Sequence, residues 1–242
     1  MVPRVHEPVR AVKTAGMIGG LGPESTIAYY RTLIAMYRDR TADDSYPHIL
    51  INSLDVAKGL RLVGAGKLDE LVDYLVAGLR QLAAAGADFG FISANTPHVV
   101  FDDVRRASPI PLVSIVEATC AKAQALGLTR LGIFGTRFTM QGRFYRDACT
   151  QAGIALVAPD DGQQTYIHEK YVGELINGII LPATRDRLLA IVESMRDAQH
   201  IDGLILGGTE LPLIITGAGH GGVPFLDTTA IHAERVVDEM LS

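Results

Sequence analysis

The chain has 242 residues, is 48% hydrophobic and 20% charged, and carries a formal net charge of −5. Its size and composition allow a substantial core in one large domain or two small ones, and scattered lysines and arginines in an acidic chain argue against a nucleic-acid partner. Residues 1–14 lack the apolar core of a signal peptide, and no stretch reaches the roughly 18 apolar residues of a membrane span. We therefore expect a cytoplasmic protein with no membrane partner.

Short apolar or β-rich runs recur along the chain, and helical patterns separate most of them. These runs are residues 14–22, 48–54, 89–95, 110–116, 130–136, 154–159, 201–208 and 223–229. Within 67–85, leucines at three- and four-residue spacing predict a helix with one apolar face, and 184–199 shows the same pattern. Strands that alternate with such helices predict βαβ units and parallel sheets covered on both faces. The predicted fold class is α/β.

The two halves of the chain resemble each other. "MIGGLGPESTIAYYRTL" at 17–33 and "IFGTRFTMQGRFYRDAC" at 133–149 both read as a strand, a glycine turn, hydroxyl residues and a helix with early aromatic residues. This repeat predicts two similar α/β domains related by pseudo-twofold symmetry, with a ligand cleft between them. The expected boundaries are an N-terminal extension at 1–13, a first domain at 14–116, a second domain at 117–223, and a C-terminal strand and helix at 224–242 that can return to the first domain.

Two strand endings carry polar residues. "SANTPH" at 93–98 follows one apolar run, and "GGTELP" at 207–212 follows another. In open α/β sheets, ligands bind outside the carboxyl ends of the strands. We therefore expect these two endings to form opposite sides of one small-molecule site.

Four separated motifs, in order, carry a resemblance to a known family. "GGLGPESTIAYY", "ANTPH", "GGTELP" and "DTTAIHAE" resemble the aspartate/glutamate racemase superfamily, with the greatest similarity to its amino-acid (aspartate-type) racemase branch. The resemblance implies two similar α/β domains and a small amino-acid or carboxylate ligand, such as aspartate or glutamate, between them. It also implies no PLP, metal or nucleotide cofactor, and a homodimer.

The resemblance implies a two-base mechanism that this chain lacks the residues to perform. In the family, one cysteine from each domain flanks the α-carbon, within motifs C-N-T and G-C-T-E. The matching positions are Ala94 and Gly208. Neither side chain can carry a proton, and each lost acid or base is worth about 10²–10⁴ in rate. Restoring cysteine at both positions is expected to create racemase activity if the rest of the cleft is retained.

The remaining polar residues suit carboxylate binding. Amide, hydroxyl and backbone N–H donors at strand ends and helix starts, with one lysine, are the candidate ligand groups. The expected substrate-binding residues are Gly20, Asn95, Thr96, Thr136, Lys170 and Thr209. Asn95 and Thr96 can alternatively serve only as helix caps. Lys170 belongs to "TYIHEKY", a polar segment in which Tyr166 and Lys170 share a helix face.

His98 and Glu210 are the candidates to replace the thiols. They follow the two strand endings closely, and one imidazole with one carboxylate would form an asymmetric acid/base pair suited to elimination, isomerisation or decarboxylation. The alternative is that His98 bonds backbone at a helix start and Glu210 supports the site structurally. Other acids at strand ends, Asp55, Glu117 and Asp227, are expected to be caps or loop residues.

The two cysteines, Cys120 and Cys149, show no metal-ligand spacing and are expected to be small buried hydrophobes. No metal site is expected. Three functions stay open: a superfamily enzyme with altered chemistry on a small carboxylate, a catalytically silent carboxylate-binding protein, and a racemase that uses unrecognised bases.

Overall fold

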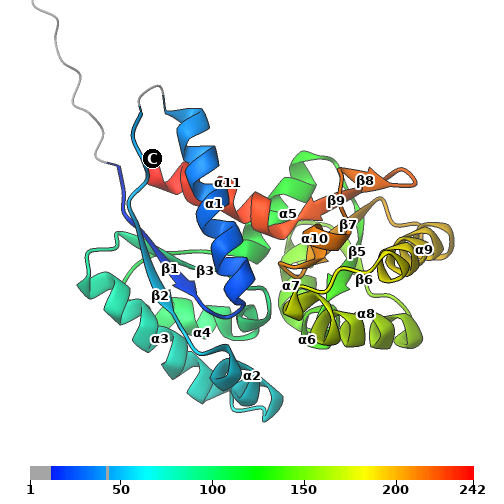
Figure 1. Cartoon of the computed structure of the whole chain (residues 1–242), viewed down its shortest axis with the longest axis horizontal. Coiled ribbons are helices and arrows are strands. Elements are labelled where there is room, and N and C mark those ends of the chain that lie inside the picture. Colours follow the sequence, from blue (N-terminus) through cyan, green and yellow to red (C-terminus); the bar gives the residue numbers. More distant parts are fainter. Residues whose placement is uncertain (1–11, 42–43) are drawn as a thin grey trace, which may run out of the picture.

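The computed structural model describes residues 12–41 and 44–242, and it contains two separate β-sheets (Figure 1). The first sheet has the order β2-β1-β3-β4, and the second has the order β6-β5-β7-β9-β8. All pairings are parallel except that of β8 with β9. We call the part of the chain with strands β1 to β4 the first half, and the part with strands β5 to β9 the second half. The predicted α/β class with parallel sheets is confirmed.

The elements follow the alternation predicted from the sequence. The first half contains β1 (Ala15–Gly19), α1 (Pro23–Arg40), β2 (Ile49–Ser53), α2 (Val56–Gly64), α3 (Leu68–Ala84), β3 (Phe89–Ile92), the 3-10 helix η1 (Thr96–Val100), α4 (Phe101–Ala107) and β4 (Leu112–Val113). Then follow α5 (Ile115–Ala125), β5 (Arg130–Gly135), α6 (Arg137–Gln141), α7 (Arg143–Gln151), β6 (Ala155–Val157), α8 (Asp161–Gly173), the 3-10 helix η2 (Leu175–Asn177), α9 (Pro182–Gln199), β7 (Gly203–Gly207), α10 (Leu211–Ile214), β8 (Gly219–His220), β9 (Val223–Asp227) and α11 (Thr228–Met240).

The strand order repeats between the halves. In the first sheet β1 lies between β2 and β3, with β4 beyond β3; in the second, β5 lies between β6 and β7, with β9 beyond β7. This equivalence places the ends of β3 and β7 in corresponding positions. These are the strands from which the two polar endings emerge.

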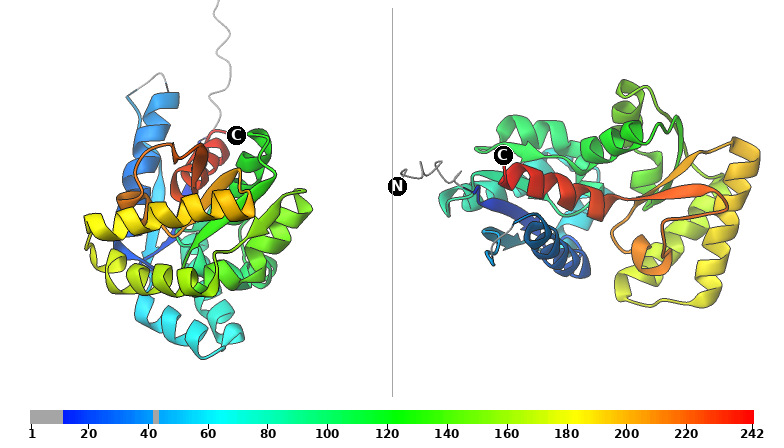
Figure 2. Two further views of the ribbon diagram at one scale, coloured as in Figure 1. Left: turned by 90° about the vertical axis from the view of Figure 1, so that its right-hand side faces the viewer. Right: turned by 90° about the horizontal axis from the view of Figure 1, so that it is seen from above.

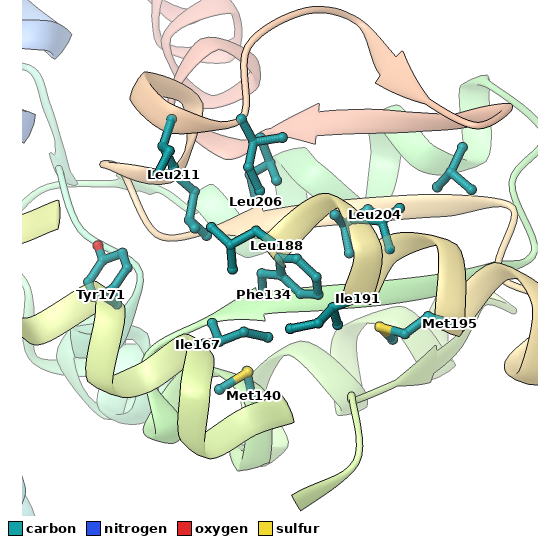
Figure 3. Close-up of a cluster of buried hydrophobic side chains, with 14 of the residues drawn as sticks. Phe134, Met140, Ile167, Tyr171, Leu188, Ile191, Met195, Leu204, Leu206 and Leu211 are labelled. Carbon is teal, nitrogen blue, oxygen red and sulfur yellow. The ribbon is translucent and has the colours of Figure 1, made fainter. Parts of the chain in front are cut away.

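Each sheet is buried on both faces, which explains the continuous apolar runs in its strands. Alternation along β1 sends Met17 to a cluster with α1 and α11, and Ile18 to a cluster with α2, α3 and α4. In the second half, Phe134 packs with α8 and α9 (Figure 3), and Ile133 packs with α5 and α7. The helices predicted over 67–85 and 184–199 are α3 and α9.

The cysteines belong to the core on the α5–α7 side of the second sheet. Cys120 lies in α5 and Cys149 in α7, both buried and both free. Their sulfur atoms are 3.2 Å apart. The expectation of small buried side chains in helices agrees with this placement.

The two halves exchange helices. Helix α5, which follows β4 of the first sheet, packs in the core of the second half. Helix α11, which follows β9 of the second sheet, packs against α1 and β1 in the first half, as Figure 2 shows. Of the C-terminal segment predicted at 224–242, therefore, the strand belongs to the second sheet, and only the helix returns to the first half.

His232 secures this returning helix. Its ring is fully buried, and Nε2 donates to the Val113 carbonyl at 3.1 Å, since a carbonyl can only accept. Nδ1 then accepts from the Tyr29 hydroxyl at 2.8 Å. The histidine thus joins α11 to α1 and β4 in its neutral form. Burial lowers the pKa of His232 to about 4.

Acid is therefore expected to weaken the fold through His232. The folded pKa is depressed, so between about pH 6.5 and 4 the unfolded chain binds the proton that the folded chain excludes, and the free energy of unfolding falls as pH falls. The contribution is on the order of 3 kcal/mol at its limit. Urea denaturation at a series of pH values should show that the free energy of unfolding changes less steeply with pH in His232→Gln than in the wild type.

His48→Gln, which changes an exposed histidine, is the control and should leave that pH dependence unchanged. His98 is buried as well, so part of the wild-type slope should survive in His232→Gln. An unaltered slope in His232→Gln would contradict this account of how α11 is held.

Candidate functional site

A cavity of about 140 Å³ lies where the two polar strand endings meet. The ending of β3 contributes Ala94, Asn95 and Thr96, and the ending of β7 contributes Gly208 and Glu210. Cavities of roughly 150 Å³ can hold a molecule the size of benzene. The space therefore matches a small ligand in contact with both halves.

Asn95 joins the halves at one side of this cavity. Its Oδ1 accepts from the hydroxyl of Tyr145 in α7 at 2.6 Å, and its Nδ2 donates to the hydroxyl of Thr228 in α11 at 3.2 Å. Thr228 in turn donates to the Leu206 carbonyl at 2.8 Å. The Asn95 side chain makes no cap bond to η1. Both ends of this amide are thus used to hold the β3 ending against the second half.

A chain of hydroxyl groups crosses between the halves. The oxygens of Thr96 and Thr136 are 3.2 Å apart, and those of Thr136 and Thr139 are 3.1 Å apart. Thr136 also caps α6 by accepting from the Thr139 backbone N–H. In that bond the Thr136 oxygen is the acceptor. The hydroxyl hydrogen of Thr136 is therefore still available for a hydrogen bond to Thr96 or to a ligand.

Glu210 is a buried carboxylate in the wall formed by the second half. Its Oε2 accepts from the hydroxyls of Tyr171 and Thr209, the latter at 3.0 Å. Its Oε1 is directed at the first half, since a side-chain carbon added to Gly22 would lie 3.2 Å from it. Gly22 is the N-cap residue of α1, so Oε1 faces the positive end of that helix dipole, which favours a carboxylate.

Tyr171 occupies the space beside Gly208. A side-chain carbon added to Gly208 would lie 2.3 Å from Cε2 of Tyr171 and 2.8 Å from its hydroxyl oxygen. Figure 3 shows the ring at the edge of a buried cluster, with the hydroxyl pointing away from Phe134 and Ile167. The ring of Tyr171 can thus occupy this position only because residue 208 has no side chain.

This contact corrects the expectation about restored cysteines. The backbone of Gly208 is not in the left-handed region, so its conformation would permit cysteine. The ring of Tyr171 would nevertheless overlap the new side chain. We therefore expect that replacing Ala94 and Gly208 by cysteine also requires a smaller residue at position 171.

Burial raises the pKa of Tyr171 well above its usual value, and the neighbouring Glu210 carboxylate raises it further. The Thr209 hydroxyl and the Glu210 backbone N–H act in the opposite direction without reversing the shift. The phenol is therefore neutral at physiological pH. It acts as a hydrogen-bond donor to Glu210.

The remaining wall of the cavity is apolar. It is formed by Leu21, Val56, Leu60, Val63, Leu71 and Ile176. Among the described residues that line the cavity, none is lysine, arginine or histidine, and the only ionisable side chains are Tyr171 and Glu210. Both belong to the second half, so the described first-half residues in this wall include no ionisable side chain.

Three of the predicted site residues lie elsewhere. His98 is buried beneath this wall, where Nδ1 donates to the Ala94 carbonyl at 3.0 Å and the ring stacks on Phe101. Burial lowers the pKa of His98 to about 3. Lys170 pairs with Glu174 on the outer side of α8. The Gly20 N–H donates to the Thr26 hydroxyl at 2.8 Å.

The structure therefore does not bring His98 and Glu210 together as an acid/base pair. His98 borders a separate hollow, and its Nε2 has no hydrogen-bond partner within the described part of the chain. Asp55 and Asp227 cap α2 and α11, as expected of acids at strand ends. Glu117 pairs with Arg105 at 2.7 Å.

Sequence reasoning missed Tyr171 and the apolar wall from α2. In the "TYIHEKY" segment, helical spacing predicts that Tyr166 and Lys170 share a face and does not distinguish Tyr171. The contact that distinguishes Tyr171 is with Gly208, which is 37 positions away along the chain. The signal in the sequence is that glycine stands at position 208, where the family resemblance implies cysteine. A missing side chain at that position indicates that another residue fills the space beside it.

In residues 12–41 and 44–242, no cluster of three or more His, Cys, Asp or Glu side chains is arranged to hold a metal ion. Over the same ranges, every helix is too short or too polar to cross a membrane.

Comparison with known proteins agrees with this architecture. The Asp/Glu/Hydantoin racemase family matches residues 18–236. The chain is 25% identical over 233 residues to the broad specificity amino-acid racemase RacX of Bacillus subtilis (strain 168), covering 94% of this chain and 98% of that protein.

Two solved structures are similar over almost the whole chain. A putative Asp/Glu racemase from Yersinia pestis is 33% identical with a TM-score of 0.87, and an aspartate racemase homologue from Pyrococcus horikoshii OT3 is 30% identical with a TM-score of 0.81. Each comparison covers 95% of this chain and 100% of the other. The α/β architecture with two sheets is thus shared with these solved structures. This chain belongs to the Asp/Glu/Hydantoin racemase family.

The contact between Gly208 and Tyr171 predicts a specific pattern of stability. Gly208→Ala should lower the free energy of unfolding by about 1–3 kcal/mol, because a methyl group would overlap a buried ring. In a Tyr171→Ala background the same change should cost little. Urea denaturation of the two single variants and the double variant measures this coupling.

Gly173→Ala is the matched control, because nothing lies within 4 Å of the added carbon. It should leave stability unchanged or slightly raise it. Equal costs of Gly208→Ala in both backgrounds would show that Tyr171 does not occupy the space beside residue 208.

Proposed function

We propose that the cavity between the halves binds a small amino acid or related carboxylate, and that the protein does not racemise it by the two-thiol mechanism of its family. The observation that carries the proposal is that Ala94 and Gly208 border the same cavity. These are the positions at which the family resemblance calls for cysteine, and neither residue can accept or donate a proton.

The hydroxyl groups support binding of a carboxylate. Thr96 and Thr136 bring hydroxyl groups from opposite halves to within 3.2 Å of each other, so one of the two can donate to the other and the second is left to donate to a ligand. The Thr209 hydroxyl lines the same wall but donates to Glu210. A small number of such placed polar groups fixes the orientation of a small ligand in a mostly apolar pocket. A neutral hydroxyl site of this size also suits a monocarboxylate better than a dicarboxylate, which would need a further cationic partner.

The apolar wall supports a ligand with a small apolar side chain. Val56, Leu60 and Val63 of α2 face the cavity, and among the described lining residues there is no cation to pair with a side-chain carboxylate. The similarity to a relative named as a broad specificity amino-acid racemase is compatible with a ligand other than aspartate or glutamate. We therefore propose alanine or a similar small amino acid ahead of the acidic ones.

Two alternative functions would bind the same ligand and differ from this proposal only in what happens to the ligand's α-hydrogen. A silent binding protein would hold the ligand and exchange none of its hydrogens, whereas a racemase with unrecognised bases would invert it. The asymmetric distribution of ionisable groups in the cavity favours chemistry on one face of the ligand over inversion, which needs a group on each face.

Binding should depend on the Thr136 hydroxyl. L- and D-enantiomers of alanine, aspartate and glutamate would be titrated by NMR, with alanine expected to bind more tightly than the acidic pair. Thr136→Val should weaken binding about 10- to 100-fold, since a hydrogen bond to a charged group is worth about 1.5–3 kcal/mol. Chiral chromatography should detect no opposite enantiomer.

Thr136→Ser keeps both the hydroxyl and the cap of α6 and loses only the methyl group, so it should bind as the wild type does. Equal affinity of the wild type and Thr136→Val would contradict the proposed contact between the Thr136 hydroxyl and the ligand. Inversion of any of these amino acids by the wild type would show that the lost thiols have been replaced on both faces.

A homodimer is proposed as well. Apolar side chains are exposed on α1 and near the edge strand β2, namely Ile27, Tyr30, Tyr46 and Ile51, and such surfaces are typical of protein interfaces. Light scattering during size-exclusion chromatography would give twice the chain mass. A cytoplasmic location stays a prediction from the sequence.

A further inference from the structure

The space beside Gly208 contains the hydroxyl group of Tyr171 as well as its ring. The position of an added side-chain carbon at residue 208 lies 2.8 Å from the hydroxyl oxygen of Tyr171. A group bonded to residue 208 would therefore have its reactive atom close to where this oxygen lies. Tyr171 reaches this place from α8, 37 positions earlier in the chain.

The hydroxyl is connected to a second proton carrier. It donates to Oε2 of Glu210, which also accepts from Thr209 at 3.0 Å. Tyr171 and Glu210 are almost fully buried, at 6% and 3% exposure, yet both border the cavity. The two groups form a pair through which a proton can pass between the cavity and a buried carboxylate.

The opposite wall offers nothing comparable. Ala94 borders the cavity at the position matching the other strand ending, and the neighbouring first-half residues in the wall are apolar or carry amide and hydroxyl groups. His98 lies behind Ala94 and bonds its carbonyl, so its imidazole does not reach the cavity. Proton transfer in this cavity is available on one side only.

We propose that Tyr171 is a catalytic residue that exchanges the α-proton of the bound amino acid on the Gly208 side, with Glu210 as its proton acceptor. This inference rests on the proposed function, because it requires a small amino carboxylate in the cavity. It goes further by assigning the reacting group and the face of the ligand on which that group acts.

The step balances as a relay of two protons. The Cα–H bond breaks, its electron pair stays on the ligand as an enolate-like carbanion, and the proton forms a new O–H bond to the Tyr171 oxygen. At the same time, the original phenolic proton moves to the Glu210 carboxylate, which becomes a carboxylic acid. The phenol is neutral before and after the step, consistent with an environment that disfavours phenolate.

Reversal of this relay returns a proton to the same face. With a deuteron supplied by solvent to Glu210 or Tyr171, the amino acid gains deuterium at its α-carbon and keeps its configuration. Inversion is excluded because no acid on the Ala94 side can protonate the other face. The one-faced carbanion is also the intermediate from which an elimination or isomerisation would proceed.

The test is α-hydrogen exchange in D₂O, followed by NMR, with L-alanine, D-alanine, L-aspartate and L-glutamate as probes. The wild type should deuterate at least one probe, and chiral analysis should recover it without its enantiomer. Tyr171→Phe keeps the ring that fills the space beside Gly208 and should slow exchange about 10²–10⁴-fold. Its affinity for the same probe should change little.

Tyr29→Phe is the matched control, because Tyr29 is also fully buried and forms a single hydroxyl bond, to His232, outside the cavity. Its exchange rate should equal that of the wild type. Glu210→Gln provides a second variant if Tyr171→Phe does not fold. It preserves the shape of the side chain and removes the proton acceptor, so it should also slow exchange.

Unaltered exchange in either folded variant would overturn the role of Tyr171 and Glu210. Binding of a probe by the wild type without exchange would overturn it as well, and would leave the proposed binding function intact. Absence of both binding and exchange for every probe would contradict the proposed function together with this inference. Appearance of the opposite enantiomer at the rate of exchange would overturn the assignment of exchange to one face, because inversion requires a second proton carrier on the Ala94 side.

Discussion

The shape of this cavity depends on one steric constraint: residue 208 has no side chain, and the ring of Tyr171 fills the space. A side-chain carbon there would lie 2.3 Å from the ring, far closer than two carbons can approach without contact repulsion. The loss of a side chain from the β7 ending and the presence of a large residue on α8 are therefore one feature. That feature brings a phenol and the Glu210 carboxylate to the wall of a cavity that is otherwise apolar or hydroxyl-lined.

The site also depends on how the halves are held together. Each half contributes a helix to the core of the other, α5 in one direction and α11 in the other, so neither sheet is fully covered without its partner. At the cavity, Asn95 of the first half bonds Tyr145 and Thr228 at the same time. The two strand endings are thus kept at a fixed separation by buried bonds. Asn95 stabilises the site geometry, and its amide is not free to turn toward a ligand.

The fold was predictable because its determinants are local. Apolar runs without alternation mark strands covered on both faces, and the three- and four-residue spacing in 67–85 marks the covering helix α3. The two strand endings border one cavity, since equivalent strands in a repeated α/β unit end at equivalent places, and the use of that cavity as a ligand site stays a prediction. Thr96, Thr136, Thr209 and Glu210 were all identified as candidates and all line the cavity.

The remainder of the site depends on three-dimensional packing that sequence spacing does not encode. His98 follows its strand ending as closely as Glu210 follows the other, yet one turn of 3-10 helix directs its ring inward, where it stacks on Phe101. Lys170 and Tyr171 are adjacent in α8, and the helix sends the first outward to Glu174 and the second inward. Which of two neighbours reaches the cavity is decided by the rotation of the helix against β5.

The central claim is that Tyr171 faces the reacting carbon of a ligand held between the two strand endings. A crystal structure of the wild type with bound L- or D-alanine tests this most directly. The account predicts that the ligand carboxylate contacts the Thr96 and Thr136 hydroxyls, and that the Tyr171 oxygen lies about 3–3.5 Å from Cα, the separation of reacting atoms in a productive complex. A ligand whose Cα–H bond points at Ala94, or that lies beyond reach of Tyr171, would contradict it.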